Sequence, residues 1–350
     1  MRTWSIFGVS LLTATIGFGQ STTLQWQPQT SGVTARLCGI SAVSPDVAWT
    51  SGASGTVLRT SDAGKTWQPR PVPGATTLDF RDVDAISAEV AYALSIGPGE
   101  ASRIFKTRDG GATWTLQLAN TDPQVFLDAM AFRDEAHGVA FSDSVAGHFV
   151  IFTTANGGAD WRRVPTDRLP PALPGEGAFA ASGSNVALGS GGRIWIGTTA
   201  SRVLSSSDDG LTWRVVTTPV AAGEATGIFS IAFRDAAHGV VVGGNYQQEG
   251  RAVNNVAVTS DGGVTWTLAR GLSGFRSAVA WWPGGGGGWL AVGPAGADWS
   301  SDDGRTWTAA GDQGYDALSV VPGGAAAWAS GAGGRLARVT RVRPLAFAIP

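Results

Sequence analysis

Short apolar stretches recur along the chain, and each one runs into glycine, serine or aspartate. Seven of them lie at residues 47–52, 90–95, 138–143, 185–190, 239–244, 288–293 and 326–331. Further apolar stretches precede several of these, at 77–80, 126–132 and 227–233, so we expect these to be inner strands and the seven stretches, residues 185–190 included, to be second strands. Such runs between turn-forming residues are typical of buried β-strands, and apolar positions at helical spacing are essentially absent. The pattern predicts an all-β protein made of repeated units.

A polar phrase separates the apolar stretches and occurs six times, first as TSDAGKTW at residues 60–67. Its acid or amide positions are Asp62, Asp109, Asn156, Asp208, Asp261 and Asp302, and its aromatic positions are Trp67, Trp114, Trp161, Trp213, Trp266 and Trp307. An Asp or Asn side chain accepts backbone N–H groups in tight turns, and glycine supplies a positive φ. The Trp buries a large surface. We call this phrase the clasp and predict that all six copies, including the Asn156 copy, are structural hairpin turns.

Successive clasp tryptophans are 47, 47, 52, 53 and 41 residues apart. These spacings are typical of four-stranded propeller blades. A seventh unit near residues 318–339 lacks a clasp and an outer strand, whereas residues 24–28 resemble the strand that follows the first clasp. We therefore predict a seven-bladed β-propeller over residues 20–342, closed by the N-terminal strand pairing into the last blade, because closure removes exposed strand edges.

The chain ends differ from the repeats. Residues 1–19 combine Arg2 with a short apolar stretch and small residues before Gln20, as a secretory signal peptide does. Residues 343–350 form an apolar tail. The sequence predicts an exported protein, periplasmic or secreted, with no membrane span after cleavage of the signal; an uncleaved N-terminal anchor is the alternative.

Composition narrows the chemistry. The formal charge is −2 and no basic block occurs, which argues against nucleic acid as a partner. Cys38 is the single cysteine and three histidines are scattered, so we expect neither a metal site nor a cofactor. His137 and His238 occupy equivalent places in two repeats, which favours a structural role in turns. We expect a monomer.

The clasp resembles the Asp-box, or bacterial neuraminidase repeat. Residues 132–138 (FRDEAHG) and 233–239 (FRDAAHG) make the chain similar to the photosystem II stability/assembly-factor type of propeller over its whole mature length. This resemblance implies the propeller fold and a scaffold or assembly role. Related propellers include sialidases and proteins described as oxidoreductases, so both activities need testing against the residues.

A functional site is expected on the face opposite the clasps, where the central channel opens. Loops before the inner strands and loops between second and third strands meet there. The polar residues assigned to this channel face are Arg36, Asp79, Asp128, Asp143, Glu176, Asn245, Tyr246, Arg251, Arg276, Asp298, Tyr315 and Asp316. We expect the carboxylates of blades 2 to 4 to face Arg36 of blade 1 and Arg276 of blade 6. We predict that this face binds a protein, a small molecule or a glycan.

Catalysis is the second hypothesis. Asp128, Asp143 and Glu176, with Arg276, are candidates for the acid/base carboxylates of a glycan hydrolase or lyase. A sialidase mechanism also needs three arginines and a tyrosine activated by glutamate; Tyr246 and Tyr315 are conceivable nucleophiles, but residues 35–38 lack the usual Arg-Ile-Pro. An oxidoreductase is disfavoured because no Gly-x-Gly-x-x-Gly opens a helix, and glycines 284–288 fit a hairpin loop. A third reading is that the channel face is solvated and has no function.

Overall fold

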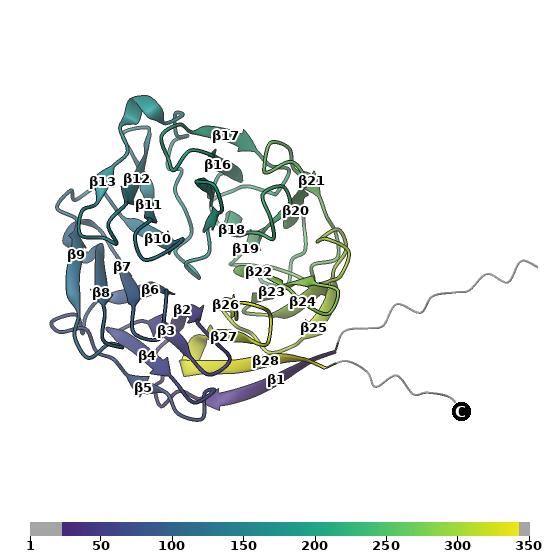
Figure 1. Ribbon diagram of the computed structural model, residues 1–350. Coiled ribbons are helices and arrows are strands. Elements are labelled where there is room, and N and C mark those ends of the chain that lie inside the picture. Colours follow the sequence, from purple (N-terminus) through teal and green to yellow (C-terminus); the bar gives the residue numbers. More distant parts are fainter. Residues whose placement is uncertain (1–22, 343–350) are drawn as a thin grey trace, which may run out of the picture.

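Seven four-stranded antiparallel sheets are arranged around a central axis (Figure 1) in the computed structural model, which describes residues 23–342. The first four blades are β2 (Leu37–Ala42), β3 (Ala48–Gly52), β4 (Thr56–Thr60), β5 (Gln68–Pro69); β6 (Asp79–Ala85), β7 (Ala91–Ile96), β8 (Arg103–Thr107), β9 (Thr115–Ala119); β10 (Leu127–Phe132), β11 (Gly138–Val145), β12 (His148–Thr154), β13 (Arg162–Arg163); and β14 (Val186–Gly189), β15 (Arg193–Gly197), β16 (Arg202–Ser206), β17 (Arg214–Thr217). The last three are β18 (Thr226–Phe233), β19 (Gly239–Asn245), β20 (Val256–Thr259), β21 (Thr267–Leu268); β22 (Ala278–Trp282), β23 (Gly288–Gly293), β24 (Gly296–Ser300), β25 (Thr308–Gly311); and β26 (Ala317–Val320), β27 (Ala327–Gly331), β28 (Arg335–Val342), β1 (Thr23–Thr30). The predicted seven-bladed propeller is confirmed.

The two ends of the described chain close the ring together. β1 pairs antiparallel with β28 over its whole length, from Thr23 opposite Val342 to Thr30 opposite Arg335. Trp26 stacks on Tyr315 with ring centroids 5.1 Å apart, and its indole donates to the Ala310 carbonyl of blade 6. The N-terminal strand is therefore the outer strand of blade 7. The predicted signal peptide and tail lie outside the described residues.

Each clasp joins the third strand of a blade to the fourth. In the first copy, the Thr66 backbone N–H and hydroxyl donate to the two oxygens of Asp62 at 2.9 and 2.7 Å, and Thr60 donates to Asp62 at 2.9 Å. The same bonds recur around Asp109, Asp208, Asp261 and Asp302. Asn156 also accepts the backbone N–H four residues on, at 2.9 Å. All six copies form turns, and their residues stabilise hairpins.

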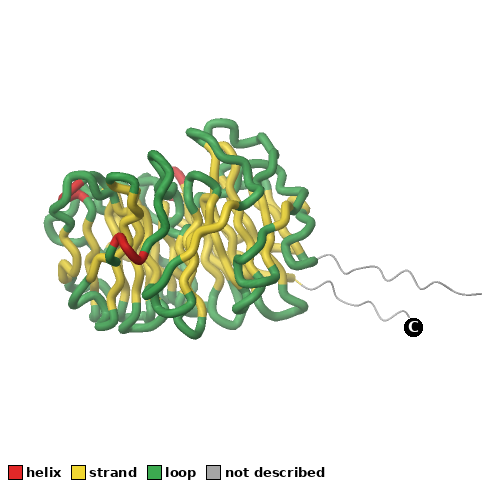
Figure 2. Tube along the Cα trace, turned by 90° about the horizontal axis from the view of Figure 1, so that it is seen from above, coloured by secondary structure: helices red, strands yellow, loops and turns green. Residues whose placement is uncertain are grey.

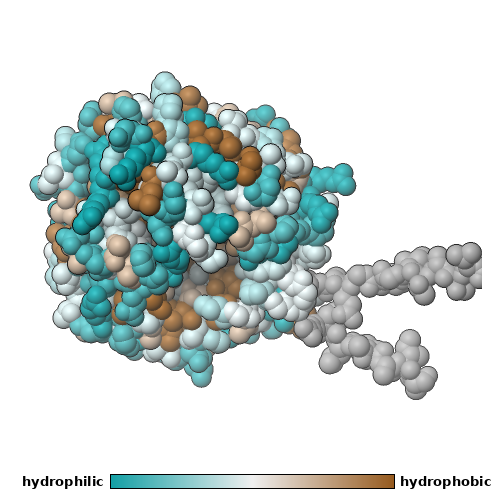
Figure 3. All heavy atoms as spheres, turned by 45° about the horizontal axis from the view of Figure 1, so that its top comes forward, coloured by the Kyte–Doolittle hydropathy of each residue, from teal (hydrophilic) through white to brown (hydrophobic). Residues whose placement is uncertain are grey.

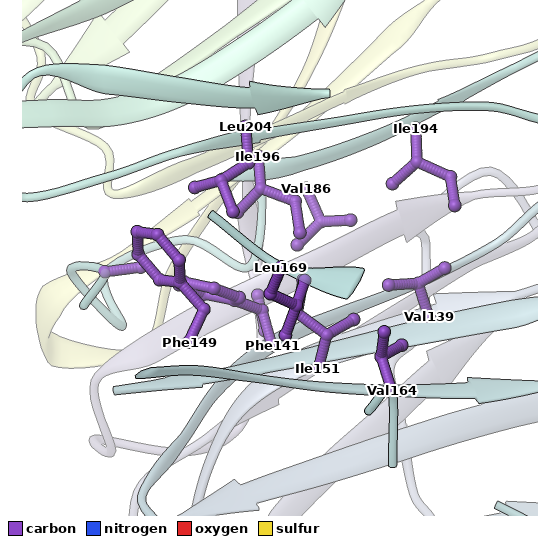
Figure 4. Close-up of a cluster of buried hydrophobic side chains, with 12 residues drawn as sticks. Val139, Phe141, Phe149, Ile151, Val164, Leu169, Val186, Ile194, Ile196 and Leu204 are labelled. Carbon is purple, nitrogen blue, oxygen red and sulfur yellow. The ribbon is translucent and has the colours of Figure 1, made fainter. Parts of the chain in front are cut away.

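Aromatic and aliphatic side chains fill the spaces between blades. The clasp residues Trp67 and Trp114 pack edge-on against Trp328 and Trp49 of the preceding blades. Between blades 3 and 4 the core contains Phe141, Phe149 and a set of branched residues (Figure 4). Burial of such side chains stabilises each blade pair by an amount proportional to the apolar area removed from water.

Blade 4 departs from the prediction. Residues 185–190 were expected to form its second strand, but β14 (Val186–Gly189) is its innermost strand and pairs with β15. The prediction was wrong because β14 has the same apolar pattern as the second strands of other blades. As a consequence, residues 177–185 are free to run elsewhere, and they enter the centre of the ring.

The remaining elements are short. The described part of the chain has three single-turn 3-10 helices, η1 (Gly99–Ala101), η2 (Thr166–Arg168) and η3 (Ala332–Gly334), and loops cover both rims of the ring (Figure 2). Across residues 23–342, no helix has the length and apolar character needed to cross a membrane. The glycine run predicted as a hairpin loop does connect β22 to β23.

Candidate functional site

The centre of the ring is occupied by residues 177–185, which we call the plug. Its bonds reach blades on different sides: Arg81 of blade 2 donates to the Ala180 carbonyl at 3.1 Å, and Ser182 donates to the Ser277 carbonyl of blade 6 at 2.8 Å. Ser184 bonds Ser230 of blade 5 at 2.8 Å. Figure 1 shows this segment running towards the middle of the ring between β10 and β18. The plug therefore crosses the central channel, which the sequence analysis had predicted to be open.

Glycine allows the plug to approach blade 2. Gly183 has a φ of +71°, and a Cβ at this position would lie 2.2 Å from an oxygen of Asp82. Asp82 accepts the Met130 backbone N–H at 2.7 Å, so its position is fixed by blade 3. Only a residue without a side chain fits here.

Two arginines predicted at the channel face form ion pairs. Arg276 is fully buried and donates from Nε to Asp298 Oδ2 at 2.7 Å. Arg36 holds Asp316 through two bonds of 2.8 Å. Burial lowers the pKa of Arg276, whereas the hydrogen bond from Arg36 to Asp316 raises the pKa of Arg36. The bidentate pair joins blade 1 to blade 7 and is a strong type of charge-assisted contact.

Glu176 is buried and is held by four donors. Arg202 contacts both of its oxygens, Thr198 donates at 2.7 Å, and the Leu173 backbone N–H donates at 2.9 Å. Arg202 also donates to the Pro171 carbonyl at 3.1 Å. Glu176 lies in the connection before β14, and it fastens the proline-rich loop to blade 4.

Asp128 and Asp143 are the two candidate carboxylates that the structure brings together. Both lie beside the Ala178 backbone N–H of the plug. Burial raises the pKa of Asp128 well above its ordinary value and the charge of Asp143 raises it further, while burial raises the pKa of Asp143. One Asp128 oxygen has no hydrogen-bond partner among the described residues. The pair is able to hold a proton, but the plug covers it.

An aromatic cluster that the sequence did not reveal lies on the channel face. Phe179 of the plug stacks on Phe229 of β18 with ring centroids 3.9 Å apart, and Phe275 packs edge-on against Phe229 at 4.6 Å. Tyr246 packs edge-on against Phe179 and Phe229 and is 44% exposed. Phe229 lies in a predicted inner strand and Phe179 in an unpredicted plug, so only the fold brings them to Tyr246.

The other predicted residues divide by exposure. Asp79 bonds Arg81 at 2.8 Å and remains partly exposed, as do Arg36 and Asp143. Asn245 ends β19, and Arg251 bonds Gln248 in the next loop. Asp298 lies inside β24, within the third strand of blade 6, and not in the predicted loop. The buried members of the predicted set are Asp128, Glu176, Arg276, Asp298, Tyr315 and Asp316.

The predicted arrangement of facing charges is therefore absent. Arg36 and Arg276 were expected to face carboxylates of blades 2 to 4, but their partners belong to blades 7 and 6. Asp316 is 280 residues from Arg36 along the chain, and Asp298 is 22 residues from Arg276 but was placed in a loop, so the sequence did not pair them. Of the predicted channel-face residues, Tyr246 and Arg251 are exposed, and Arg36, Asp79 and Asp143 are exposed in part.

Two of the three histidines lie in turns beside aspartates. His137 and His238 each contact the aspartate three residues before, Asp134 and Asp235, through Nδ1 at 2.9–3.0 Å, as expected for turn residues. The described residues include no group of three or more His, Cys, Asp or Glu side chains placed to hold a metal ion.

Two hollows of about 620 and 730 Å³ open on the clasp side, between blades 3 and 4 and between blades 5 and 6.

Comparisons with known proteins agree with the fold. No family model matches the chain. Over 140 residues the chain is 26% identical to the photosystem II stability/assembly factor HCF136 of Arabidopsis thaliana chloroplasts, a stretch that covers 39% of this chain and 33% of HCF136. The chain thus matches about a third of the length of this curated relative.

Two solved structures share the architecture. YCF48 bound to D1 peptide superposes with a TM-score of 0.63 at 16% identity, covering 90% of this chain and 96% of YCF48. The GH74 xyloglucanase of Xanthomonas campestris superposes with a TM-score of 0.61 at 16% identity, covering 93% of this chain and 55% of the enzyme. The protein is a seven-bladed propeller that is similar in part of its sequence to the photosystem II stability/assembly factor HCF136 and in its fold to YCF48.

Proposed function

We propose that this protein is an exported assembly-type factor that binds a segment of a partner protein at its channel face. The observation that carries the proposal is the aromatic cluster of Phe179, Phe229, Phe275 and the exposed Tyr246. Exposed aromatic side chains supported by a packed base are preferred contacts of peptide-binding surfaces. The likeness to YCF48, which has been observed with a peptide, and to HCF136 supports the same reading. On this view the six clasps are Asp-boxes that hold the scaffold.

The experiment is peptide-array binding with the mature protein, followed by titration of the peptides that bind. We expect Tyr246→Ala to weaken binding by about tenfold or more, since a central aromatic anchor contributes at least about 2 kcal/mol. Leu268→Ala removes an equally exposed side chain on the clasp side and serves as the control. Equal loss in both variants, or no loss in Tyr246→Ala, would contradict the assignment to the channel face.

Export is tested separately. The signal-like residues 1–19 support it. N-terminal sequencing of the protein from cell envelope and culture fluid is expected to begin at or near Gln20. An intact Met1 in the cytoplasmic fraction would overturn the export part of the proposal.

Glycan hydrolysis is the second candidate. It is favoured by the proximity of Asp128 and Asp143, their raised pKa values, and the fold likeness to a xyloglucanase. A hydrolase needs one protonated and one ionised carboxyl at the bond to be cleaved. Release of reducing ends from a panel of glycans, abolished by Asp143→Asn, would support it; unchanged release in Asp143→Asn, Asp128→Asn and Glu176→Gln would exclude these carboxylates.

A further inference from the structure

The hollow between blades 3 and 4 is the second surface of the molecule with unusual chemistry. It opens on the clasp side, has a volume of about 620 Å³, and lies against β13, β14 and the fourth clasp. Its rim carries four arginines, namely Arg133, Arg162, Arg163 and Arg168. None of the predicted channel-face residues lines it.

The floor of the hollow is apolar. Val139, Val164 and Ile194 form one end of the core between blades 3 and 4 (Figure 4), and they also line the hollow. Leu188 and Leu211 extend this floor, and Leu211 is 58% exposed. The core thus continues into an open surface that an apolar ligand group is able to cover.

The arginines of the rim are only partly neutralised. Arg133 bonds Asp209 at 2.7 Å, and Arg163 lies 3.7 Å from Asp122. Arg162 and Arg168 are exposed, and their guanidinium groups make no hydrogen bond or ion pair with other described residues.

The acids of the hollow do not neutralise these two arginines. Asp160 accepts a hydrogen bond from the Asn156 side-chain amide at 2.8 Å and forms no ion pair with either arginine. Asp209 already pairs with Arg133. A chain with a formal charge of −2 therefore presents two free guanidinium groups at one apolar hollow.

The hollow between blades 5 and 6 shows what is particular to the first. Arg234 and Asp303 repeat the pair of Arg133 and Asp209, with bonds of 2.7 and 2.9 Å. Five of its twelve lining residues carry hydroxyl groups, namely Thr259, Ser260, Thr265, Thr267 and Thr306, and the lining also includes Leu268, Arg270 and Arg305. Both hollows therefore carry arginines, but the hollow between blades 3 and 4 has more apolar side chains and fewer hydroxyl groups. Figure 3 shows how hydrophilic groups and small apolar patches stand side by side on one face of the molecule.

We propose that the hollow between blades 3 and 4 binds a small anionic amphiphile, in which a carboxylate, sulfate or phosphate head is joined to an apolar chain or ring. The guanidinium groups of Arg162 and Arg168 bind the head, because arginine matches such oxyanions with paired N–H donors. The apolar part covers Val139, Val164, Ile194 and Leu211. A volume of about 620 Å³ is in the usual range for such ligands.

The test uses isothermal titration of the mature protein with sodium decanoate and decyl phosphate, below the concentrations at which they form micelles. Both are expected to bind, and decyl maltoside, which has the same chain and a neutral head, is expected to bind about tenfold more weakly or not at all. Binding of both anions should weaken as salt rises from 20 to about 200 mM, since exposed charges are screened.

Variants assign the site. Arg162→Glu/Arg168→Glu is expected to lower the affinity for decanoate by about tenfold or more, and Leu211→Asp to lower it as well. Arg108→Glu, which changes an exposed arginine in the second clasp, is the matched control and should leave the affinity within about twofold. Tyr246→Ala should also have no effect, so failure here is distinct from failure of the channel-face proposal.

Two results would overturn the proposal: no binding of either anion, or equal decanoate affinity in wild type and in Arg162→Glu/Arg168→Glu. Inorganic phosphate separates the sources of the head group. If inorganic phosphate displaces decyl phosphate at a similar concentration, the site binds the anionic head alone and the apolar part of the proposal is wrong. If it does not, the site binds the anionic head and the apolar chain together.

Discussion

The channel face and the hollow between blades 3 and 4 both combine arginines with acids, but they differ in how the charges are paired. On the channel face Arg276 and Asp298 are fully buried together, and Arg36 holds Asp316 with two bonds. In the hollow, Arg162 and Arg168 have no such partner among the described residues. The first set of charges stabilises blade 6 and the joint between blades 7 and 1, whereas the second remains available to a ligand.

Residue type and approximate position along the chain are therefore not enough to identify a ligand-binding site in a propeller. The inner ends of the blades need polar groups to satisfy backbone N–H groups of the next blade: Ser41 accepts from Ala85, Asp82 accepts from Met130, and Ser230 accepts from Val279. Buried polar groups of this kind are retained because an unsatisfied backbone N–H is costly. Polar residues near the channel are therefore expected even without a ligand.

The largest expected effect comes from breaking the buried pair. Arg276→Met leaves Asp298 buried without its cation, and we expect a loss of about 3–5 kcal/mol in the free energy of unfolding, measured by urea denaturation. Arg162→Met at the hollow is expected to change stability by at most about 0.5 kcal/mol. Replacing both partners, as Arg276→Met/Asp298→Leu, should recover part of the loss. Similar small losses in both single variants would mean that the two regions do not differ.

A second test addresses the plug. Gly183→Ala places a Cβ against Asp82 in a backbone with positive φ, and we expect a loss of about 2–4 kcal/mol. Gly175→Ala is the matched control, because its φ is +68° and nothing lies within 4 Å of its Cβ position. That control should lose only about 1 kcal/mol from backbone strain. Equal losses in thermal or urea unfolding would show that the plug does not pack against blade 2.

A third test uses the exceptional clasp beside the hollow. The other five clasps have Asp followed by a Thr that donates to it, but Asn156 donates to Asp160 at 2.8 Å. Asn156→Asp brings two carboxylates together and should cost about 1 kcal/mol. Asn156→Asp/Asp160→Thr recreates the common clasp and should restore stability. An unchanged free energy of unfolding in Asn156→Asp would contradict this account. So would a double variant that is no more stable than the single variant.

A fourth test addresses a pH dependence within the ring. Burial raises the pKa of Asp84 to about 6, although its carboxylate accepts the Phe132 N–H at 2.6 Å. The unfolded carboxyl titrates near ~3.9. Between these values the folded state binds the extra proton, so this group's contribution to stability falls as pH rises from about 4 to about 6.

Asp84→Asn keeps an acceptor for Phe132 and removes this fall. The difference between wild type and variant should therefore change across pH 4 to 6 and be constant above it, as measured by urea unfolding at each pH. Hydrogen bonds from Thr113 lower the pKa of the clasp acid Asp109 to about 2, so its contribution to stability falls as the pH drops below about 4. This contribution is the same in wild type and variant and therefore cancels in their difference. Parallel wild-type and variant curves would contradict the assignment.

Features that depend on neighbours along the chain could be predicted from the sequence. The Asp62 to Thr66 bonds span four residues, so a short phrase specifies each clasp, and the recurrence of that phrase specifies the blades. The pairing of β1 with β28 was also predictable, because an incomplete last unit and a spare first strand leave few other ways to close the ring.

Which polar groups stabilise the fold and which remain free became clear only from the packing of the blades. Arg36 meets Asp316 across 280 positions, Arg276 meets Asp298 within its own blade, and Phe179 reaches Phe229 because the plug leaves the blade pattern. Such contacts follow from packing between segments distant in sequence, and local propensity carries no information about them. The seven-bladed ring is a property of local repeats, whereas its candidate sites are properties of how the blades, the plug and the rims pack together.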